Sequence, residues 1–300
     1  MTVAVAAVDL GGTRLRAAVV DSHGNILRRA EALTAHDLAT PEQIPSLIRE
    51  VVAGDNITRA VIGLPGRIDR ARRRLGFARN LPIEWLAYLN EEWLSSETGL
   101  DVSLGGDAEL AAVGEAYFGA GVTEGDTAYL TFSTGVGAAA LSGGRLLATH
   151  RTGFQIGLIP QIPMPGKLID TLVSGRQIEA FFRTGGYGAP SVQALLHLVD
   201  QGDVGADQLW ESIVRHASWV AVLMCHVVCP DVLVVGGGLS NAGWRLLSPM
   251  DDALRHFGPQ ELEHPIRLTT CARGDDAALA GAAAWHVATT ASEGTLNDER

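Results

Sequence analysis

The stretch VDLGGTRLR, from Val8 to Arg16, decides the fold of this chain. An apolar strand ends at Asp9, two glycines turn the chain, and a second apolar strand follows. P-loops and dinucleotide-binding fingerprints need a helix directly after their glycines, so the second strand excludes both here. The N–H groups of Gly11 and Gly12 form an anion-binding nest. The stretch therefore predicts a phosphate-binding β-hairpin, although an aspartate that caps its own turn is the simpler alternative.

Two further glycine motifs follow apolar strands later in the chain. FSTGVGAA, from Phe132 to Ala139, repeats the strand–turn–strand pattern and offers hydroxyl and bare N–H groups. The loop at Gly236–Gly238 follows the strand VLVV, and its glycines allow the close approach of a flat ring such as adenine. Two such turns that face each other can hold a polyphosphate between them. Together with the third loop for a flat ring, they predict a nucleotide site.

The composition narrows the class of protein. A chain of 300 residues is long for one core, so we expect two lobes. The formal charge of −11 repels phosphate backbones and argues against a nucleic-acid partner. The apolar run from Trp219 to Val235 is interrupted by Pro230, which favours a buried helix and strand over a membrane span. No signal peptide and no disulfide framework are visible, so we expect a cytoplasmic protein.

The order of predicted elements indicates an α/β fold made of two similar units. The first unit opens with a β-meander, and the second begins with the helix from Ala108 and then repeats the strand–turn–strand pattern, followed by helices and a last strand. Predicted strands occupy residues 2–33, 57–66, 101–107, 127–147 and 230–240, and predicted helices occupy residues 41–54, 81–99, 108–119, most of 170–229, and 275–288. The basic stretch at 67–79 predicts a solvated hairpin tip.

These motifs resemble the phosphate-1, phosphate-2 and adenosine motifs of the actin, hexokinase and Hsp70 superfamily. Within it, GLPGRID from Gly63, GDAELAAVGEAYFGAG from Gly106 and LVSGRQI from Leu172 resemble the ROK family of bacterial repressors and sugar kinases. The resemblance implies two ribonuclease-H-like lobes that close on ATP, Mg²⁺ and a sugar. We expect a small N-terminal lobe of residues 1–107 plus 277–290, a large C-terminal lobe of 108–276, and a tail of 291–300.

The resemblance also implies a set of binding residues. Those for the ATP phosphates are Asp9, Gly11, Gly12, Thr13, Arg16, Ser133, Thr134, Gly135 and Gly137, and those for adenosine are Gly236, Gly237 and Gly238. Those for the sugar are Gly63, Pro65, Gly66, Asn80, Glu84, Gly106, Asp107, Gln155 and Asp170. Asp9 is expected to face Mg²⁺ through water, because this ion keeps much of its hydration.

Two features separate the branches of the family. ROK repressors carry a winged helix before the kinase-like part, whereas here the first motif strand begins at residue 3, which favours an enzyme. Many members bind zinc through cysteines just before LVSGR, and that stretch has none here, so we expect no structural zinc. Cys225, His226 and Cys229 on an apolar helix are interpreted as core residues rather than metal ligands. Family members are commonly dimers, so the resemblance allows a homodimer.

Asp107 is the candidate catalytic residue. It stands between a predicted strand and a predicted helix, where aspartate also serves as a helix N-cap. In the family this position holds the carboxylate that accepts the proton of the sugar hydroxyl. Phosphoryl transfer needs such a base to orient the nucleophile, so we favour the catalytic role.

The sugar half of the predicted site departs from the family pattern. Gly106 replaces an asparagine, Gln155 and Leu158 replace the Glu and His of a GEIGH pattern, and Asp170 replaces a glutamate. Three hypotheses follow: a silent ATP- and sugar-binding regulator, a glucokinase with a diverged pocket, or a kinase for an altered hexose. We favour a 6-kinase for an amino sugar such as glucosamine or 3-amino-3-deoxyglucose (kanosamine).

That preference rests on two extra carboxylates. Glu84 and Glu109 lie near the predicted sugar contacts in sequence and suit a cationic amino group. Charges in the first turn of a helix are the equally natural alternative for both residues.

Overall fold

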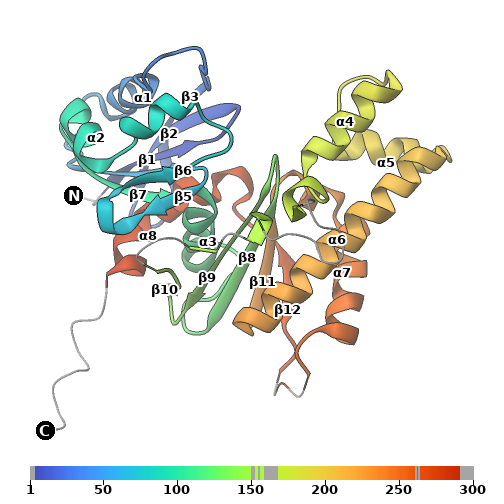
Figure 1. The fold of residues 1–300 in the computed structure, drawn as a ribbon. Coiled ribbons are helices and arrows are strands. Elements are labelled where there is room, and N and C mark those ends of the chain that lie inside the picture. The colour runs from blue at the N-terminus through green and yellow to red at the C-terminus, as the bar shows by residue number, and fades with distance from the viewer. Residues whose placement is uncertain are drawn as a thin grey trace, which may run out of the picture.

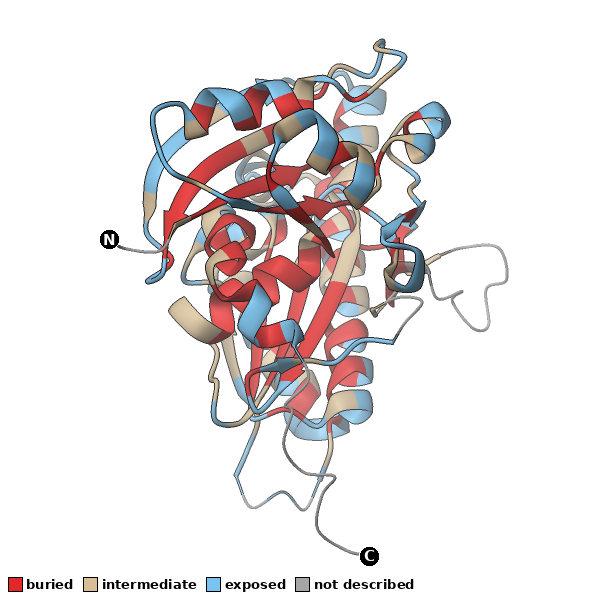
Figure 2. Cartoon of the chain, turned by 90° about the vertical axis from the view of Figure 1, so that its left-hand side faces the viewer, coloured by how far each residue is buried: buried red, intermediate tan, exposed pale blue. Residues whose placement is uncertain are grey.

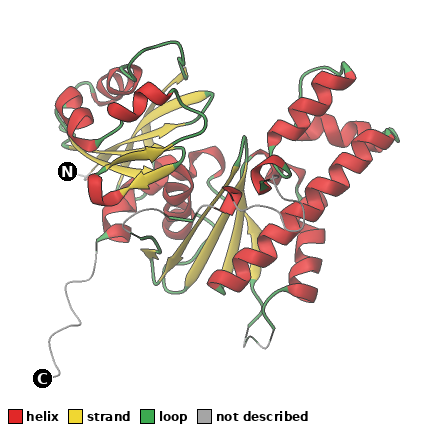
Figure 3. Cartoon of the chain, in the orientation of Figure 1, coloured by secondary structure: helices red, strands yellow, loops and turns green. Residues whose placement is uncertain are grey.

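The computed structural model describes residues 4–149, 153–154, 156–158, 168–260, 262 and 264–290. The chain forms two lobes, each built on a five-stranded sheet (Figures 1 and 3). The α/β fold class predicted from the sequence is therefore confirmed. Gln155 and the predicted tail lie outside the described residues.

The N-terminal sheet has the strand order β3-β2-β1-β4-β7. Its strands are β1 (Ala4–Leu10), β2 (Arg14–Asp21), β3 (Ile26–Leu33), β4 (Arg59–Leu64) and β7 (Asp101–Gly106). The first three are antiparallel, whereas β4 runs parallel to β1 and β7 runs parallel to β4. In the β1–β2 hairpin Asp9 lies opposite Arg16, so their side chains share one face of the sheet.

The C-terminal sheet repeats this plan with the order β10-β9-β8-β11-β12. Its strands are β8 (Asp126–Phe132), β9 (Val136–Ser142), β10 (Arg145–Leu146), β11 (Val232–Gly236) and β12 (Arg267–Thr270). Again three antiparallel strands are extended by two parallel ones. The prediction of two similar units is confirmed. The edge strand β12 was not predicted, because its short sequence RLTT has no run of apolar residues.

Two helices lie between the sheets, as Figure 1 shows. They are α3 (Asp107–Phe118) and α8 (Ala277–Thr289). α8 packs on β1 and β2, α3 packs on β8 and β9, and the two helices contact each other extensively. Their side chains join strands of both sheets in one buried cluster, which includes Leu110 and Trp285. Figure 2 shows this buried layer running through the middle of the molecule. The start of α3 is thereby fixed at the junction of the two lobes.

The outer face of the N-terminal sheet is covered by α1 (Gln43–Val52) and α2 (Glu91–Thr98). The single helix predicted over 81–99 is wrong: the chain forms a 3₁₀ turn at Ile83–Ala87 and then α2. The cause is Asn90, which is extended, bridges to Arg74, and caps α2 by accepting from the N–H of Trp93 at 2.8 Å.

The predicted basic hairpin is confirmed as β5 (Arg67–Asp69) and β6 (Arg74–Phe77). A short 3₁₀ turn at Arg70–Arg72 joins the two strands. The other 3₁₀ turns are Ile156–Leu158, Ile169–Thr171, Gly238–Ala242 and Gly274–Asp276.

The C-terminal sheet contacts the helices α6 (Val204–Val228) and α7 (Trp244–Phe257). α5 (Val192–Asp200) packs on α6, and α4 (Gly175–Gly185) packs on α5. α4 and α5 extend away from the sheets (Figure 1). The predicted helix and strand within the apolar run are confirmed as the end of α6 and β11. No helix in the described part of the chain has the length and apolar character that crossing a membrane requires. Cys225 is buried as predicted, whereas His226 and Cys229 are exposed because α6 ends there.

Candidate active site

A cleft with a volume of about 300 Å³ lies between the two lobes. Many of the predicted site residues line it together. These are Asp9, Gly11, Gly12, Arg16, Pro65, Gly66, Asn80, Gly106, Asp107, Ser133, Thr134, Gly135, Gly137, Asp170 and Gly237. The fold therefore brings the phosphate, adenosine and sugar motifs to one place.

The other predicted residues that the structure describes are not among those that line the cleft, although two of them flank the lining residue Gly237. They are Thr13, Gly63, Glu84, Gly236 and Gly238. Glu84 is exposed on the 3₁₀ turn that precedes α2, and Gly63 is packed behind the cleft against Leu110. Gly238 has open space on the side where a side chain would stand, which suits the close approach of a ring.

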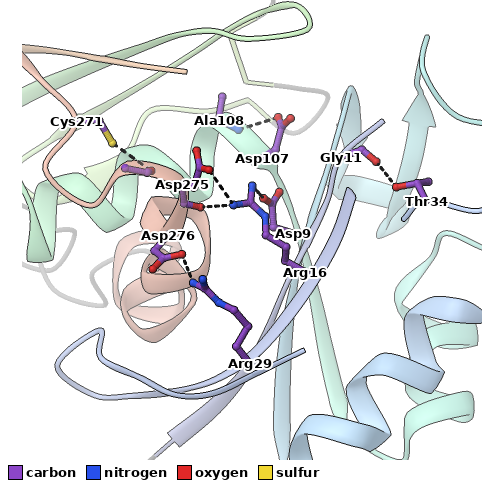
Figure 4. Close-up of polar contacts among 11 residues, drawn as sticks. Asp9, Gly11, Arg16, Arg29, Thr34, Asp107, Ala108, Cys271, Asp275 and Asp276 are labelled. Carbon is purple, nitrogen blue, oxygen red and sulfur yellow. Dashed lines mark hydrogen bonds and ion pairs between the residues drawn. The ribbon is translucent and has the colours of Figure 1, made fainter. Parts of the chain in front are cut away.

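The first glycine turn is held by short local contacts. The N–H of Gly11 donates to the carbonyl of Arg14 at 2.8 Å, so it closes the hairpin and is not free for the anion nest expected from the sequence. The Thr34 hydroxyl donates to the Gly11 carbonyl at 2.8 Å, which ties the turn to the end of β3 (Figure 4). Asn80 packs against Gly12, where an added Cβ would lie 3.2 Å from the Asn80 Cβ. The turn is thus held by two hydrogen bonds and stands beside a predicted sugar contact.

Asp9 is buried and paired with Arg16. Nη2 of Arg16 donates to Oδ2 of Asp9 at 2.7 Å, while Nη1 donates to the backbone carbonyl of Asp275 at 2.8 Å (Figure 4). Burial raises the pKa of Asp9 and the Arg16 charge opposes this rise. Arg16, predicted to bind phosphate, here neutralises Asp9 and joins β2 to the loop before α8.

That loop was missed by the sequence analysis. Gly274 and Asp275 line the cleft, and the only signal in the sequence is the pair of aspartates before the last helix. The loop is fixed by the fully buried carboxylate of Glu115 in α3. Glu115 accepts from the N–H groups of Ala272 at 2.9 Å and Arg273 at 2.6 Å. The interlobe helix α3 therefore positions Asp107 at its start and, through Glu115, the loop that carries Gly274 and Asp275.

Asp107 is the first residue of α3 and faces the cleft. The predicted alternative, a helix N-cap, is wrong, because Gly106 is the N-cap and the Glu109 carboxylate accepts from the Gly106 N–H at 2.9 Å. Among the described residues, the Asp107 carboxylate accepts from the N–H of Ala108 at 2.7 Å and makes no ion pair. Burial and the nearby charge of Asp9 raise the pKa of Asp107 to about 7.

The second glycine turn is held by Asp170. Oδ1 of Asp170 accepts from the N–H of Val136 at 2.6 Å and lies against Gly135. Oδ2 of Asp170 lies 3.6 Å from Nη1 of Arg79, an arginine of the other lobe that lines the cleft. Asp170, predicted to contact the sugar, is thus observed to hold the second glycine turn.

Three arginines surround the predicted sugar contacts, and none was predicted. Besides Arg79, Arg176 of α4 donates to Oδ1 of Asn80, and Arg70 forms an ion pair with Glu109 at 2.6 Å. Phe154 also lines the cleft at this end. Sequence spacing gives no signal for these partners, because the pairs join β-hairpin tips, loops and helix starts that are far apart in the chain.

The residues present suit a magnesium ion carried by a nucleotide. Among the described residues there is no group of three or more His, Cys, Asp or Glu side chains that would hold a metal ion alone. Mg²⁺ bound with a nucleotide instead takes one or two carboxylates, phosphate oxygens and water. Asp9 in the cleft provides such a carboxylate.

The chain is similar to known proteins over nearly its whole length. A model of the ROK family matches residues 5–289. The chain belongs to the ROK family. It is 28% identical over 302 residues to a glucokinase of Thermotoga maritima, with 92% of this chain and 95% of the relative covered. A glucokinase of Streptomyces coelicolor is also 28% identical, over 307 residues, with the same coverage.

Solved ROK structures have the same fold. The ROK family glucokinase of Streptomyces griseus, in complex with glucose and AMPPNP, superposes with a TM-score of 0.76 at 27% identity and covers 94% of this chain and 98% of its own. The ROK hexokinase of Thermus thermophilus has a TM-score of 0.75 at 26% identity, with 93% and 96% covered. The two lobes are therefore those of the actin–hexokinase fold, and the predicted ROK membership is confirmed.

Proposed function

We propose that this ROK family chain is an ATP-dependent kinase that transfers the γ-phosphoryl group to a hexose. The observation that carries the proposal is Asp107, a carboxylate without an ion pair among the described residues, in a cleft between two glycine turns. The glucokinase relatives and the structure with glucose and an ATP analogue support the same activity.

In this mechanism the two glycine turns hold the phosphates and Asp107 orients the acceptor. The Asp107 carboxylate accepts the proton of the sugar hydroxyl as that oxygen attacks the γ-phosphorus, the bond from this phosphorus to the β,γ-bridging oxygen breaks, and ADP leaves. Asp9 would hold Mg²⁺ through water, and the ion supplies neutralisation of the phosphate charge. Arg16 keeps the buried Asp9 carboxylate compensated, and the loop at Asp275 fixes the arginine in turn.

We further propose that the acceptor is the 6-hydroxyl of an amino sugar such as glucosamine or kanosamine. The missing asparagine side chain at Gly106 and the carboxylate of Glu109 beside it support this substrate class. A neutral hexose such as glucose is the alternative that the relatives favour. A pocket that leaves substrate hydroxyls unpaired discriminates against that substrate strongly, so the two classes differ in measurable efficiency.

The test of this proposal is ADP release from ATP–Mg²⁺ with glucose, mannose, N-acetylmannosamine, glucosamine and kanosamine. We expect ADP release that depends on the sugar and is fastest with an amino sugar. Fastest turnover with glucose would leave the kinase proposal intact and overturn the amino-sugar part. ADP release that is the same with and without every sugar would overturn the kinase proposal itself.

The raised pKa of Asp107 gives a second prediction, for the pH dependence. The base acts only when it is deprotonated, so kcat/KM is expected to rise with pH and level off above an apparent pKa of about 7. If the pKa of this carboxyl were unshifted, kcat/KM would instead stay the same down to about pH 4. The profile is measured with the best sugar between pH 5 and 9. A flat profile over this range would contradict the assignment of Asp107 as a buried base.

A further inference from the structure

Beside the predicted base lies a second buried carboxylate, that of Glu109. It stands on the same turn of α3, lines the cleft and is 6% exposed. Its Oε2 accepts from the Gly106 N–H at 2.9 Å and from Nη2 of Arg70 at 2.6 Å. Glu109 is therefore held in place from two sides while it still faces the acceptor end of the cleft.

The position of Glu109 depends on two glycines. A Cβ added at Gly106 would lie 3.2 Å from Oε2, and one added at Gly153 would lie 2.1 Å from Oε1. The carboxylate thus occupies the space that side chains at these two positions would take. It stands next to the position where the asparagine of the family pattern is missing.

Arg70 comes from the tip of the β5–β6 hairpin, far from α3 in the chain. Its side chain is 23% exposed, and its Nη1 is buried with no hydrogen-bond partner among the described residues. Arg72, two residues further on, is 70% exposed, and its partner among the described residues is Asp69 of the same hairpin. In the described part of the chain, Arg70 therefore reaches the cleft only through Glu109, whereas Arg72 stays on the hairpin.

We propose that Glu109 and Arg70 form the pair that determines acceptor selectivity, which rests on the proposed function. Glu109 supplies a carboxylate oxygen that accepts hydrogen bonds from the sugar ring, in place of the side chain that is missing at Gly106. Arg70 holds the carboxylate and neutralises part of its charge. The pair then sets how strongly the site prefers a cationic amino substituent over a neutral hydroxyl.

The charge of Glu109 is the quantity to vary. Glu109→Gln keeps the acceptor oxygen for the Gly106 N–H, because glutamine also serves in a capping box, but it removes the charge. We expect it to lower the ratio of kcat/KM for glucosamine to that for glucose about 10- to 100-fold, the range expected for a charge-assisted hydrogen bond. Arg70→Gln leaves the Glu109 charge uncompensated, so the same ratio is expected to rise.

The matched control is Arg72→Gln, which removes an arginine of the same turn and is expected to leave the ratio unchanged. A merely structural role for the pair predicts equal losses with both sugars, and that result would overturn the proposal. An unchanged ratio in both variants would overturn it as well. If neither sugar is phosphorylated, the kinase proposal fails. The ratio of the dissociation constants for glucosamine and glucose, measured by calorimetry, then tests the selectivity pair independently.

Discussion

Replacing Asp107 by asparagine is expected to lower kcat by a factor of about 10²–10⁴, the usual cost of losing a general base. The asparagine would keep the size of the side chain and its place at the start of α3, but it cannot accept the proton of the attacking hydroxyl. The two glycine turns are untouched, so the dissociation constant of an ATP analogue is expected to change little. Both quantities are measured on the same preparation, by ADP release and by calorimetry.

The stability of this variant separates a chemical effect from a folding effect. The raised pKa of Asp107 means that the folded state binds the proton more tightly than the unfolded state does. The free energy of unfolding therefore falls as pH rises from about 4 to about 7. Above that range the full loss of stability caused by the buried charged carboxylate is present. At pH 8 Asp107→Asn is expected to melt at or above the temperature of the original protein. Turnover within tenfold of the original would contradict the catalytic role.

The second large effect is expected at the crossing of α3 and α8. A Cβ added at Gly281 would lie 1.9 Å from the carbonyl oxygen of Leu110, and one at Gly114 would lie 2.0 Å from that of Ala277. Alanine normally stabilises a helix interior by about 1 kcal/mol relative to glycine. Here the neighbour is backbone and cannot rotate away, so Gly281→Ala is expected to lower the free energy of unfolding by more than about 3 kcal/mol.

This substitution is also expected to lower activity at temperatures where the protein stays folded, because separating the helices moves the start of α3. Chemical denaturation followed by circular dichroism measures the change in stability. Gly188→Ala is the control, since no atom lies within 4 Å of the added Cβ and the backbone there is not left-handed. A Gly281→Ala protein as stable as the original would show that the two helices can separate without cost.

Local pattern was sufficient to predict most elements. Apolar strands interrupted by glycine turns predict both meanders, because a strand needs only its own alternation and a turn needs only its own glycines. The prediction of one helix over 81–99 failed because a residue outside this stretch, Arg74 of β6, forms a bridge with Asn90. A helical pattern in the sequence does not report such a competing strand contact.

By itself, the sequence determined the strands and glycine turns, because each depends on residues close together in the chain. These motifs also carry the family resemblance, which implied the two lobes and Asp107 as the candidate base. Only the tertiary structure decided the partners of the charges: Arg16 with Asp9, Arg70 with Glu109, and Arg79 with Asp170. The last two pairs join segments that are distant in sequence. Arginine side chains are long and flexible, so their partners follow from how the lobes and hairpins pack, which no local pattern encodes.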